Sequence, residues 1–228
     1  MLFTLSQGGG TLRAAQAIEL ALHQLEPDAM VKLVDILQLE HAGLLRRAVK
    51  TGLQAAGKRA VRNPDQVSLG YDLLDQPGGV RNFPLSDRIR LWPRRKFIHL
   101  GANLVDKEIS RLLLSEPWDC IVSTVTFPYR VIASLKSQGK WQSPTYMVTT
   151  DFVPHRSCVS RIPDHYFTAT EEWRAYLETQ GLSADFVSTT GIPIDPKFAQ
   201  SQDRSRCLKS LGLTGDRPVL VFLPVNSN

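Results

Sequence analysis

The stretch Met147–Phe167, MVTTDFVPHRSCVSRIPDHYF, decides which fold the sequence predicts. It continues an apolar, strand-like run at residues 145–149 and then breaks into a polar loop. That loop carries Thr150, Asp151, His155 and Arg156 before a second short strand is expected at residues 166–169. In an open α/β sheet, ligands bind in the crevice outside the carboxyl ends of the strands. We therefore expect this loop to carry the functional site.

A second candidate lies near the N-terminus, where a short apolar run at residues 2–5 leads into Gly8, Gly9 and Gly10. From Thr11 onwards, apolar residues recur every three or four positions, which predicts a helix with Thr11 as its cap. A strand, a glycine turn and a helix N-terminus together can bind an anion. The alternative is a tight connection that uses glycine only for its permissive backbone. The full dinucleotide-binding fingerprint is missing.

Strands and helices alternate along the rest of the chain. Strands are expected at residues 31–36, 118–123, 185–189 and 219–223, and helices at 104–114, 129–138, 171–180 and 204–211. This alternation predicts an α/β fold with a Rossmann-like parallel sheet flanked by helices. Because prolines bound the segment before 219–223, we expect one domain over residues 1–200. Residues 201–228 would then hold a crossing and the first strand of a truncated second domain.

Two basic segments stand out. Residues 41–62 have an apolar stripe and basic polar positions without an acidic residue, which suits an anionic membrane surface. Residues 88–97 combine arginines with Trp92 and Phe97, as at lipid headgroups. The alternatives are a helix packed on the domain and a solvated loop. The positions expected to contact a membrane are Arg46, Arg47, Lys50, Trp92, Arg94 and Arg95.

Composition limits the remaining classes. With 228 residues, 43% of them apolar, the chain can fill a sizeable core. Its three cysteines have irregular spacing and form no CxxC pattern, which predicts neither a disulfide framework nor a metal site. No apolar run approaches the roughly 20 residues needed to span a bilayer. We therefore expect a cytoplasmic protein, peripherally associated with the membrane. The net charge of +5 is modest, and its uneven placement along the chain matters more than the sum.

Five motifs in order make the chain resemble a known family: SQGGGTLRAAQAIELAL, PYRVIASLKSQGK, VTTDFVPHRS, DHYFTATEEWRAYLETQG and TGIPIDPKF. The chain is similar to the N-terminal half of the monogalactosyldiacylglycerol synthase and processive diacylglycerol glucosyltransferase family, within glycosyltransferase family 28. The resemblance implies the GT-B architecture, in which an N-terminal domain binds a lipid acceptor and a C-terminal domain binds a UDP-sugar. It implies no cofactor beyond this donor substrate.

The resemblance also implies site residues. Asp151 and His155 would line the acceptor side of the cleft as catalytic residues. The positions expected to bind the acceptor or an anion are Gly8, Gly9, Gly10, Thr11, Thr150 and Arg156. The chain departs from the family at Thr11, where a histidine base is usual, and at Cys158, where a tryptophan is usual. A threonine hydroxyl is a poor general base.

The expected function is the acceptor-side half of a lipid glycosyltransferase that moves galactose or glucose from a UDP-sugar to diacylglycerol. We expect this chain alone to be inactive, because the donor-binding half of the family does not follow. The alternative is a non-catalytic membrane-lipid-binding module or degenerate remnant, which a separate donor-binding chain could complete. No nucleic-acid motif accompanies the basic residues, so a lipid surface is the favoured partner.

Overall fold

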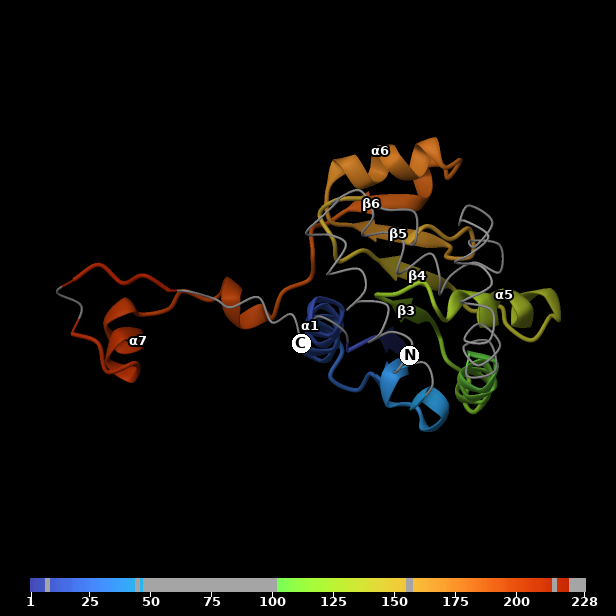
Figure 1. The fold of residues 1–228 in the computed structure, drawn as a ribbon, viewed down its shortest axis with the longest axis horizontal. Coiled ribbons are helices and arrows are strands. Elements are labelled where there is room, and N and C mark those ends of the chain that lie inside the picture. The colour runs from blue at the N-terminus through green and yellow to red at the C-terminus, as the bar shows by residue number, and fades with distance from the viewer. Residues whose placement is uncertain (7–8, 44–45, 47–101, 155–157, 215–216, 222–228) are drawn as a thin grey trace, which may run out of the picture.

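A computed structural model of the protein describes residues 1–6, 9–43, 46, 102–154, 158–214 and 217–221 (Figure 1). Its centre is a six-stranded sheet in the order β2-β1-β3-β4-β5-β6, and every neighbouring pair is parallel. The strands are β1 (Leu2–Thr4), β2 (Leu33–Asp35), β3 (Ile121–Ser123), β4 (Thr145–Val148), β5 (His165–Thr168) and β6 (Val187–Thr189). The predicted α/β fold with a parallel, Rossmann-like sheet is confirmed.

The helices pack on the sheet through small, aliphatic and aromatic side chains. Helix α1 (Gly10–Leu25) buries Ala14, Ala15 and Ala17, whose small size lets the helix lie close to the strands. Helix α5 (Tyr129–Ser137) buries Tyr129 and other residues, and α6 (Glu171–Thr179) buries Trp173 and Leu177. A further helix covers residues 102–114.

The chain moves from β1 to β2 in one direction and from β3 to β6 in the other. Because crossovers between parallel strands are right-handed, α1 and the helices after β3 lie on opposite faces of the sheet. The core combines residues far apart in sequence, such as Phe3, Ile109 and Tyr166, all fully buried. Among the described residues, no helix is long and apolar enough to cross a membrane.

Most of the predicted elements that fall within the described residues are present, with shifted ends. The strand expected at residues 185–189 begins at Val187, because the Ser183 hydroxyl accepts a hydrogen bond from the Asp185 N–H and starts the short 3-10 helix η6 (Ala184–Phe186). Residues 36–42 form two further 3-10 turns, η1 (Ile36–Gln38) and η2 (Glu40–Ala42). Most of the basic helix expected at 41–62 lies outside the described residues, as does the aromatic and basic cluster at 88–97.

Near the C-terminal end, one expectation is wrong. Residues 219–221 of the strand expected at 219–223 form no strand and are exposed at 42%, 83% and 73%, and its last two residues lie outside the described part of the chain. A strand requires a neighbour to satisfy its backbone groups, and no described strand pairs with this run. The segment before it contains the 3-10 helix η7 (Pro196–Ala199) and α7 (Arg204–Ser210), which stands apart from the sheet in Figure 1.

Candidate functional site

The topology makes the carboxyl ends of β1 and β3 the candidate ligand site. The strand order reverses between these strands, since the chain leaves β1 for β2 and later returns to the other side of β1 as β3. In open α/β sheets, such a switch point is where ligands bind. The loops after β1, β3, β4 and β5 all lie at this edge, which we call the carboxyl edge.

The glycine turn after β1 leads directly into α1. Gly9 has a φ of 81°, a left-handed conformation that glycine adopts without steric cost, and it is the residue before the helix. The Thr11 hydroxyl makes no cap; it donates to the Leu5 carbonyl over 2.5 Å. The expectation that Thr11 caps the helix is therefore wrong. Thr11 lies inside the first turn, where its hydroxyl reaches back to the end of the strand.

Two other side chains fix this turn. The Asp35 carboxylate, at the end of β2, accepts hydrogen bonds from the Ser6 N–H at 3.1 Å and the Leu37 N–H at 3.0 Å. The Thr124 hydroxyl, just after β3, lies 3.1 Å from the Thr4 hydroxyl and 3.3 Å from the Thr11 carbonyl. The turn is thus held from the neighbouring strand on each side.

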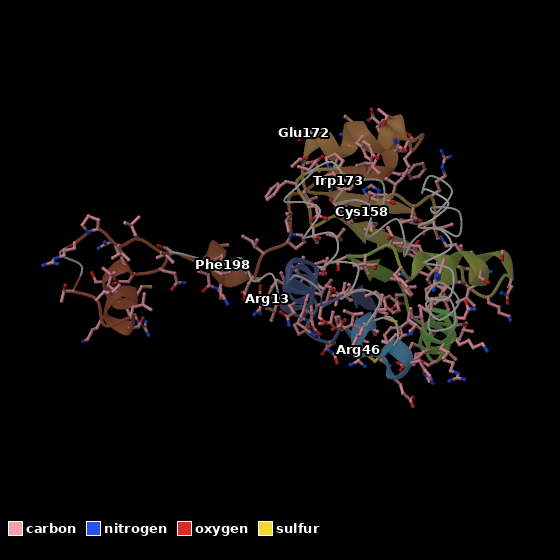
Figure 2. All side chains as sticks on the ribbon, viewed as in Figure 1. Arg13, Arg46, Cys158, Glu172, Trp173 and Phe198 are labelled. Atoms are coloured by element: carbon pink, nitrogen blue, oxygen red, sulfur yellow. The ribbon has the colours of Figure 1, made fainter. Side chains whose placement is uncertain are left out.

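The N-terminus of α1 is electropositive. The first N–H groups of a helix have no partner within the helix, and the helix dipole adds a partial positive charge there. The first turn contains no acidic residue, and the exposed Arg13 follows it (Figure 2), although the Asp195 carboxylate, which caps η7, interacts electrostatically with Arg13. Gly9 and Gly10 are exposed, so this end of the helix can be approached from solvent. The arrangement is compatible with binding an anionic or strongly polar group.

Thr150 and Asp151 follow β4 at the same carboxyl edge. Asp151 is exposed, and its backbone carbonyl accepts a hydrogen bond from the Trp173 indole N–H over 2.6 Å. Strand β4 is separated from β1 by β3 alone. With neighbouring strands about 4.8 Å apart, the ends of β1 and β4 lie about 10 Å from each other along the edge. The segment around Asp151 therefore opens to solvent on the same edge as the glycine turn.

Several predicted site residues lie outside the described residues. They are Gly8, His155, Arg156, Arg47, Lys50, Trp92, Arg94 and Arg95. Of the positions expected to contact a membrane, only Arg46 falls within the described part, where it is exposed (Figure 2).

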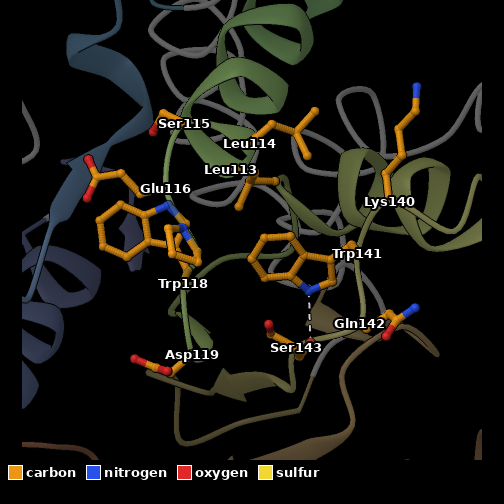
Figure 3. A pocket seen from close by; sticks show the side chains of 11 residues that line it. Leu113, Leu114, Ser115, Glu116, Trp118, Asp119, Lys140, Trp141, Gln142 and Ser143 are labelled. Atoms are coloured by element: carbon orange, nitrogen blue, oxygen red, sulfur yellow. Dashed lines mark hydrogen bonds between the residues drawn. The ribbon is translucent and has the colours of Figure 1, made fainter.

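The opposite, amino edge of the sheet carries a cavity of about 620 Å³ (Figure 3). Its walls include Trp118, Trp141, Glu116, Asp119 and Lys140, from the segments that precede β3 and β4. Both indole N–H groups are already used: Trp118 donates to the Leu112 carbonyl and Trp141 to the Ser143 carbonyl. This cavity lies away from the switch point, so we do not assign the acceptor to it.

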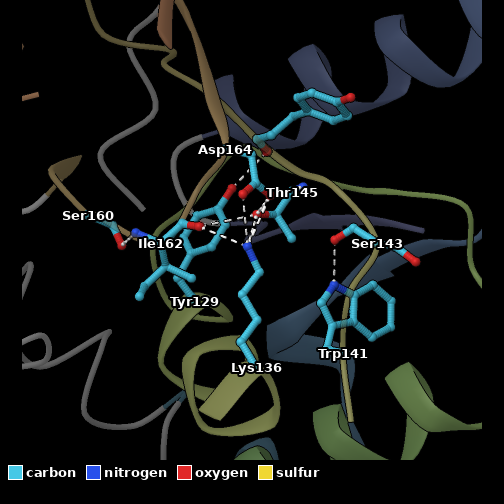
Figure 4. A network of polar contacts seen from close by, with 9 residues as sticks. Tyr129, Lys136, Trp141, Ser143, Thr145, Ser160, Ile162 and Asp164 are labelled. Carbon is cyan, nitrogen blue, oxygen red and sulfur yellow. Dashed lines mark hydrogen bonds and ion pairs between the residues drawn. The ribbon is translucent and has the colours of Figure 1, made fainter. Parts of the chain in front are cut away.

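A polar network at the same amino edge joins β4 to β5 (Figure 4). The Asp164 carboxylate accepts hydrogen bonds from the Thr145 N–H at 2.7 Å, the Thr145 hydroxyl at 2.8 Å and the Lys136 ammonium at 3.0 Å. Burial alone would raise the pKa of Asp164, but the bonds from Lys136 and Thr145 outweigh it and lower that pKa. The Lys136 ammonium and the Asp164 carboxylate pair with each other, so the network needs no ligand to balance its charges and serves to hold β4 and β5 together.

This network predicts part of the acid sensitivity of the fold. Since its folded-state pKa is lowered, Asp164 stabilises the native state above its unfolded pKa of about 4, and this contribution is lost as the pH falls through the folded value. We expect Asp164→Asn to lower the free energy of unfolding at neutral pH by about 1 kcal/mol and to flatten its decline below about pH 4. Urea unfolding at several pH values measures both, with the exposed Asp119→Asn as control. An equally steep acid decline in both variants would contradict this role.

Another polar cluster links η2 to helix 102–114. The Glu108 carboxylate accepts hydrogen bonds from the Glu40 and His41 N–H groups and lies 3.2 Å from the His41 Nδ1 atom. Burial alone would raise the pKa of Glu108, but these hydrogen bonds lower it. Ligand atoms of Glu40, His41 and Glu108 lie within 4.8 Å of one another. Capping of η2 accounts for these contacts, so we assign no metal to the cluster.

Sequence reasoning missed a row of buried hydroxyls at the carboxyl edge. Nearly every strand ends in one, and the row comprises Thr4, Ser123, Thr124, Thr149 and Thr168. They satisfy backbone groups of the loops: the Ala169 N–H, for example, donates to the Thr149 hydroxyl over 3.0 Å. The recurrence of Ser or Thr at the end of the strands expected at 118–123, 145–149 and 185–189 was the available signal.

The fold and the layout of the site define a class. A six-stranded parallel sheet with flanking helices is a Rossmann-like α/β domain consistent with the N-terminal domain of GT-B glycosyltransferases. Residues 87–194 match the family model described as monogalactosyldiacylglycerol (MGDG) synthase. The family resemblance that the motifs indicated is thereby confirmed for this part of the chain.

Curated relatives agree with this match. The chain is 29% identical over 134 residues to the processive diacylglycerol beta-glucosyltransferase of Bacillus pumilus, covering 59% of this chain and 34% of that protein. The enzyme of the same name from Bacillus cytotoxicus is 30% identical over 129 residues, covering 57% and 33%. That from Bacillus thuringiensis is 35% identical over 104 residues, covering 46% and 26%. The matched part of the chain thus spans about a third or less of the length of these relatives.

Proposed function

We propose that this domain is the acceptor-side half of a lipid glycosyltransferase that transfers galactose or glucose from a UDP-sugar to diacylglycerol. The observation that carries the proposal is the pairing of two features at one edge of the sheet. The electropositive start of α1 follows the end of β1, and the exposed Asp151 follows β4. The names of the relatives point to diacylglycerol as the acceptor.

In this proposal, the acceptor hydroxyl approaches the carboxyl edge near Asp151, whose carboxylate accepts a hydrogen bond from it. During transfer the hydroxyl oxygen forms a bond to the anomeric carbon of the sugar, the bond to UDP breaks and UDP departs. A base must take the hydroxyl proton. Thr11 is unsuited to that role, since a neutral threonine hydroxyl is a poor general base. Asp151, or His155 outside the described residues, is the candidate.

We propose further that the domain works at a membrane surface. Diacylglycerol resides in the bilayer, and a basic protein is attracted to anionic lipids. The exposed Arg46, together with Arg47, Lys50, Trp92, Arg94 and Arg95, would make this contact. Thr11, whose hydroxyl is a poor base and donates to the Leu5 carbonyl, also favours a second candidate function. This is a lipid-binding module without activity of its own, which a separate donor-binding chain completes.

Vesicle co-sedimentation tests the acceptor proposal. We expect binding to phosphatidylcholine vesicles to rise when phosphatidylglycerol is added and to fall again at high salt, because ionic screening weakens attraction between exposed charges. At fixed phosphatidylglycerol, adding diacylglycerol should raise the bound fraction further, and this increment should persist in salt. Equal binding with and without diacylglycerol would contradict acceptor recognition.

A sugar-transfer assay then separates the two candidates. With diacylglycerol and labelled UDP-glucose or UDP-galactose, a glycolipid product formed by the 228-residue chain alone would support hexose transfer and overturn the expectation of an inactive chain. Diacylglycerol binding without product would favour the lipid-binding module.

A further inference from the structure

Trp173 connects the loop after β5 to the segment that carries Asp151. Its ring is fully buried beneath α6 and lies edge-on to Tyr176, with ring centroids 6.2 Å apart and an interplanar angle of 86°. From this fixed position, the indole N–H donates to the Asp151 carbonyl over 2.6 Å. An exposed residue is thus attached by its backbone to one of the largest fully buried side chains of the core.

Two further hydrogen bonds join the same segments. The Ala169 N–H donates to the Thr149 hydroxyl over 3.0 Å, and the Thr170 hydroxyl donates to the Phe152 carbonyl over 3.4 Å. Residues 149–152 after β4 are therefore attached at three points to residues 169–173 after β5. Among these contacts, only the one from Trp173 ends on Asp151 itself.

We propose that Trp173 is a positioning residue, which sets the place of Asp151 at the carboxyl edge through its indole N–H. The inference rests on the proposed role of Asp151 in acceptor binding. Asp151 is exposed, so water can replace the indole at its carbonyl if the donor is removed. Loss of the hydrogen bond should therefore release the segment rather than unfold the domain.

The chain supplies a matched control. Trp141 is also buried, at 7% exposure, and its indole N–H donates to the backbone carbonyl of Ser143 over 2.8 Å. That contact lies at the opposite, amino edge of the sheet. Trp173→Phe and Trp141→Phe thus remove the same type of hydrogen bond and keep an aromatic ring, but only the first touches the Asp151 segment.

The first measurement is structural and needs no lipid. Backbone ¹⁵N relaxation should show the order parameters of Asp151 and Phe152 falling from about 0.85 to below about 0.6 in Trp173→Phe, with no change in Trp141→Phe. If Trp173→Phe is too unstable to study, Thr170→Val, which removes the hydroxyl bound to Phe152, should give a smaller change of the same kind. Unchanged order parameters in these variants would overturn the inference that the Trp173 indole N–H holds the Asp151 segment in place.

The second measurement asks whether the hydrogen bond from the Trp173 indole affects lipid binding through the Asp151 side chain. Trp173→Phe should weaken diacylglycerol-dependent vesicle binding about fivefold in the native background and leave it unchanged in an Asp151→Ala background. A merely structural role would lower binding equally in both backgrounds and would overturn the inference. If the native chain shows no diacylglycerol-dependent binding, the proposed function fails, and the relaxation data still decide whether the Trp173 indole N–H holds the Asp151 segment in place.

Discussion

Raising the pH above about 10 should destabilise this domain steeply, because two fully buried tyrosines must stay protonated in the native state. Burial raises the pKa of Tyr129 and of Tyr166, and the hydrogen bond from the Ser160 backbone offsets only part of this for Tyr166. The Tyr166 hydroxyl donates to the Ser160 carbonyl and accepts from its N–H, both at 2.7 Å. The Tyr129 hydroxyl donates to the Tyr146 carbonyl at 2.7 Å.

The direction of the change in unfolding free energy with pH follows from the number of protons that the folded and unfolded states bind. Above the unfolded pKa of about 10, tyrosines in the unfolded chain lose their protons while the buried pair keeps them, so the unfolded state gains stability as the pH rises. Each buried tyrosine should lower the free energy of unfolding by about 1.4 kcal/mol per pH unit, until its folded pKa is reached. Two such groups give nearly 3 kcal/mol per unit, a large part of the roughly 5–15 kcal/mol that stabilises a typical domain.

Urea unfolding between about pH 8 and 11 measures this dependence. Tyr166→Phe should lose about 2 kcal/mol at pH 8, because it leaves two backbone groups of Ser160 without their partner, and its slope at high pH should be roughly half that of the native chain. Tyr129→Phe should show a similar reduction in slope. If both variants keep the native slope, the alkaline loss does not originate in these two tyrosines.

The sequence predicted the elements of the fold better than its polar contacts. Helix α1 and strands β4 and β5 follow from local patterns, since periodicity and turn residues act over a few positions. The hydroxyl contact between Thr124 and Thr4 joins residues 120 positions apart, and no local pattern encodes such a pairing. The run at 219–221 shows the reverse error, because an apolar pattern does not form a strand where no described neighbour pairs with it.

The sequence also predicted part of the candidate site and missed the rest. The expectation that a polar loop follows β4 placed Asp151 at the carboxyl edge, because parallel strands necessarily end together. The partner that holds it was not predicted, since Trp173 fits the apolar stripe of a helix and gives no sign that its N–H reaches another loop. Thr11 was misjudged because the same hydroxyl can cap a helix or bind the preceding strand, and only the φ of 81° at Gly9 decides between these.

The last prediction concerns Asp151 and the acceptor. We expect Asp151→Ala to weaken diacylglycerol-dependent vesicle binding by about 10- to 100-fold, since a hydrogen bond to a charged group contributes about 1.5–3 kcal/mol. Asp151→Asn keeps an acceptor oxygen without the charge and should lose about tenfold. The measurement is the co-sedimentation titration with diacylglycerol at fixed phosphatidylglycerol.

Charge alone must be separated from recognition, because removing any carboxylate makes this protein more cationic and strengthens its attraction to anionic lipids. Asp119→Ala is the matched control: Asp119 is also exposed but lies at the amino edge beside the cavity. Both variants should bind phosphatidylglycerol slightly better in the absence of diacylglycerol. Only Asp151→Ala should show the diacylglycerol-dependent increment weakened by about 10- to 100-fold. Loss of that increment in Asp119→Ala, or its undiminished survival in Asp151→Ala, would remove the carboxyl edge as the acceptor site and direct attention to the opposite edge of the sheet.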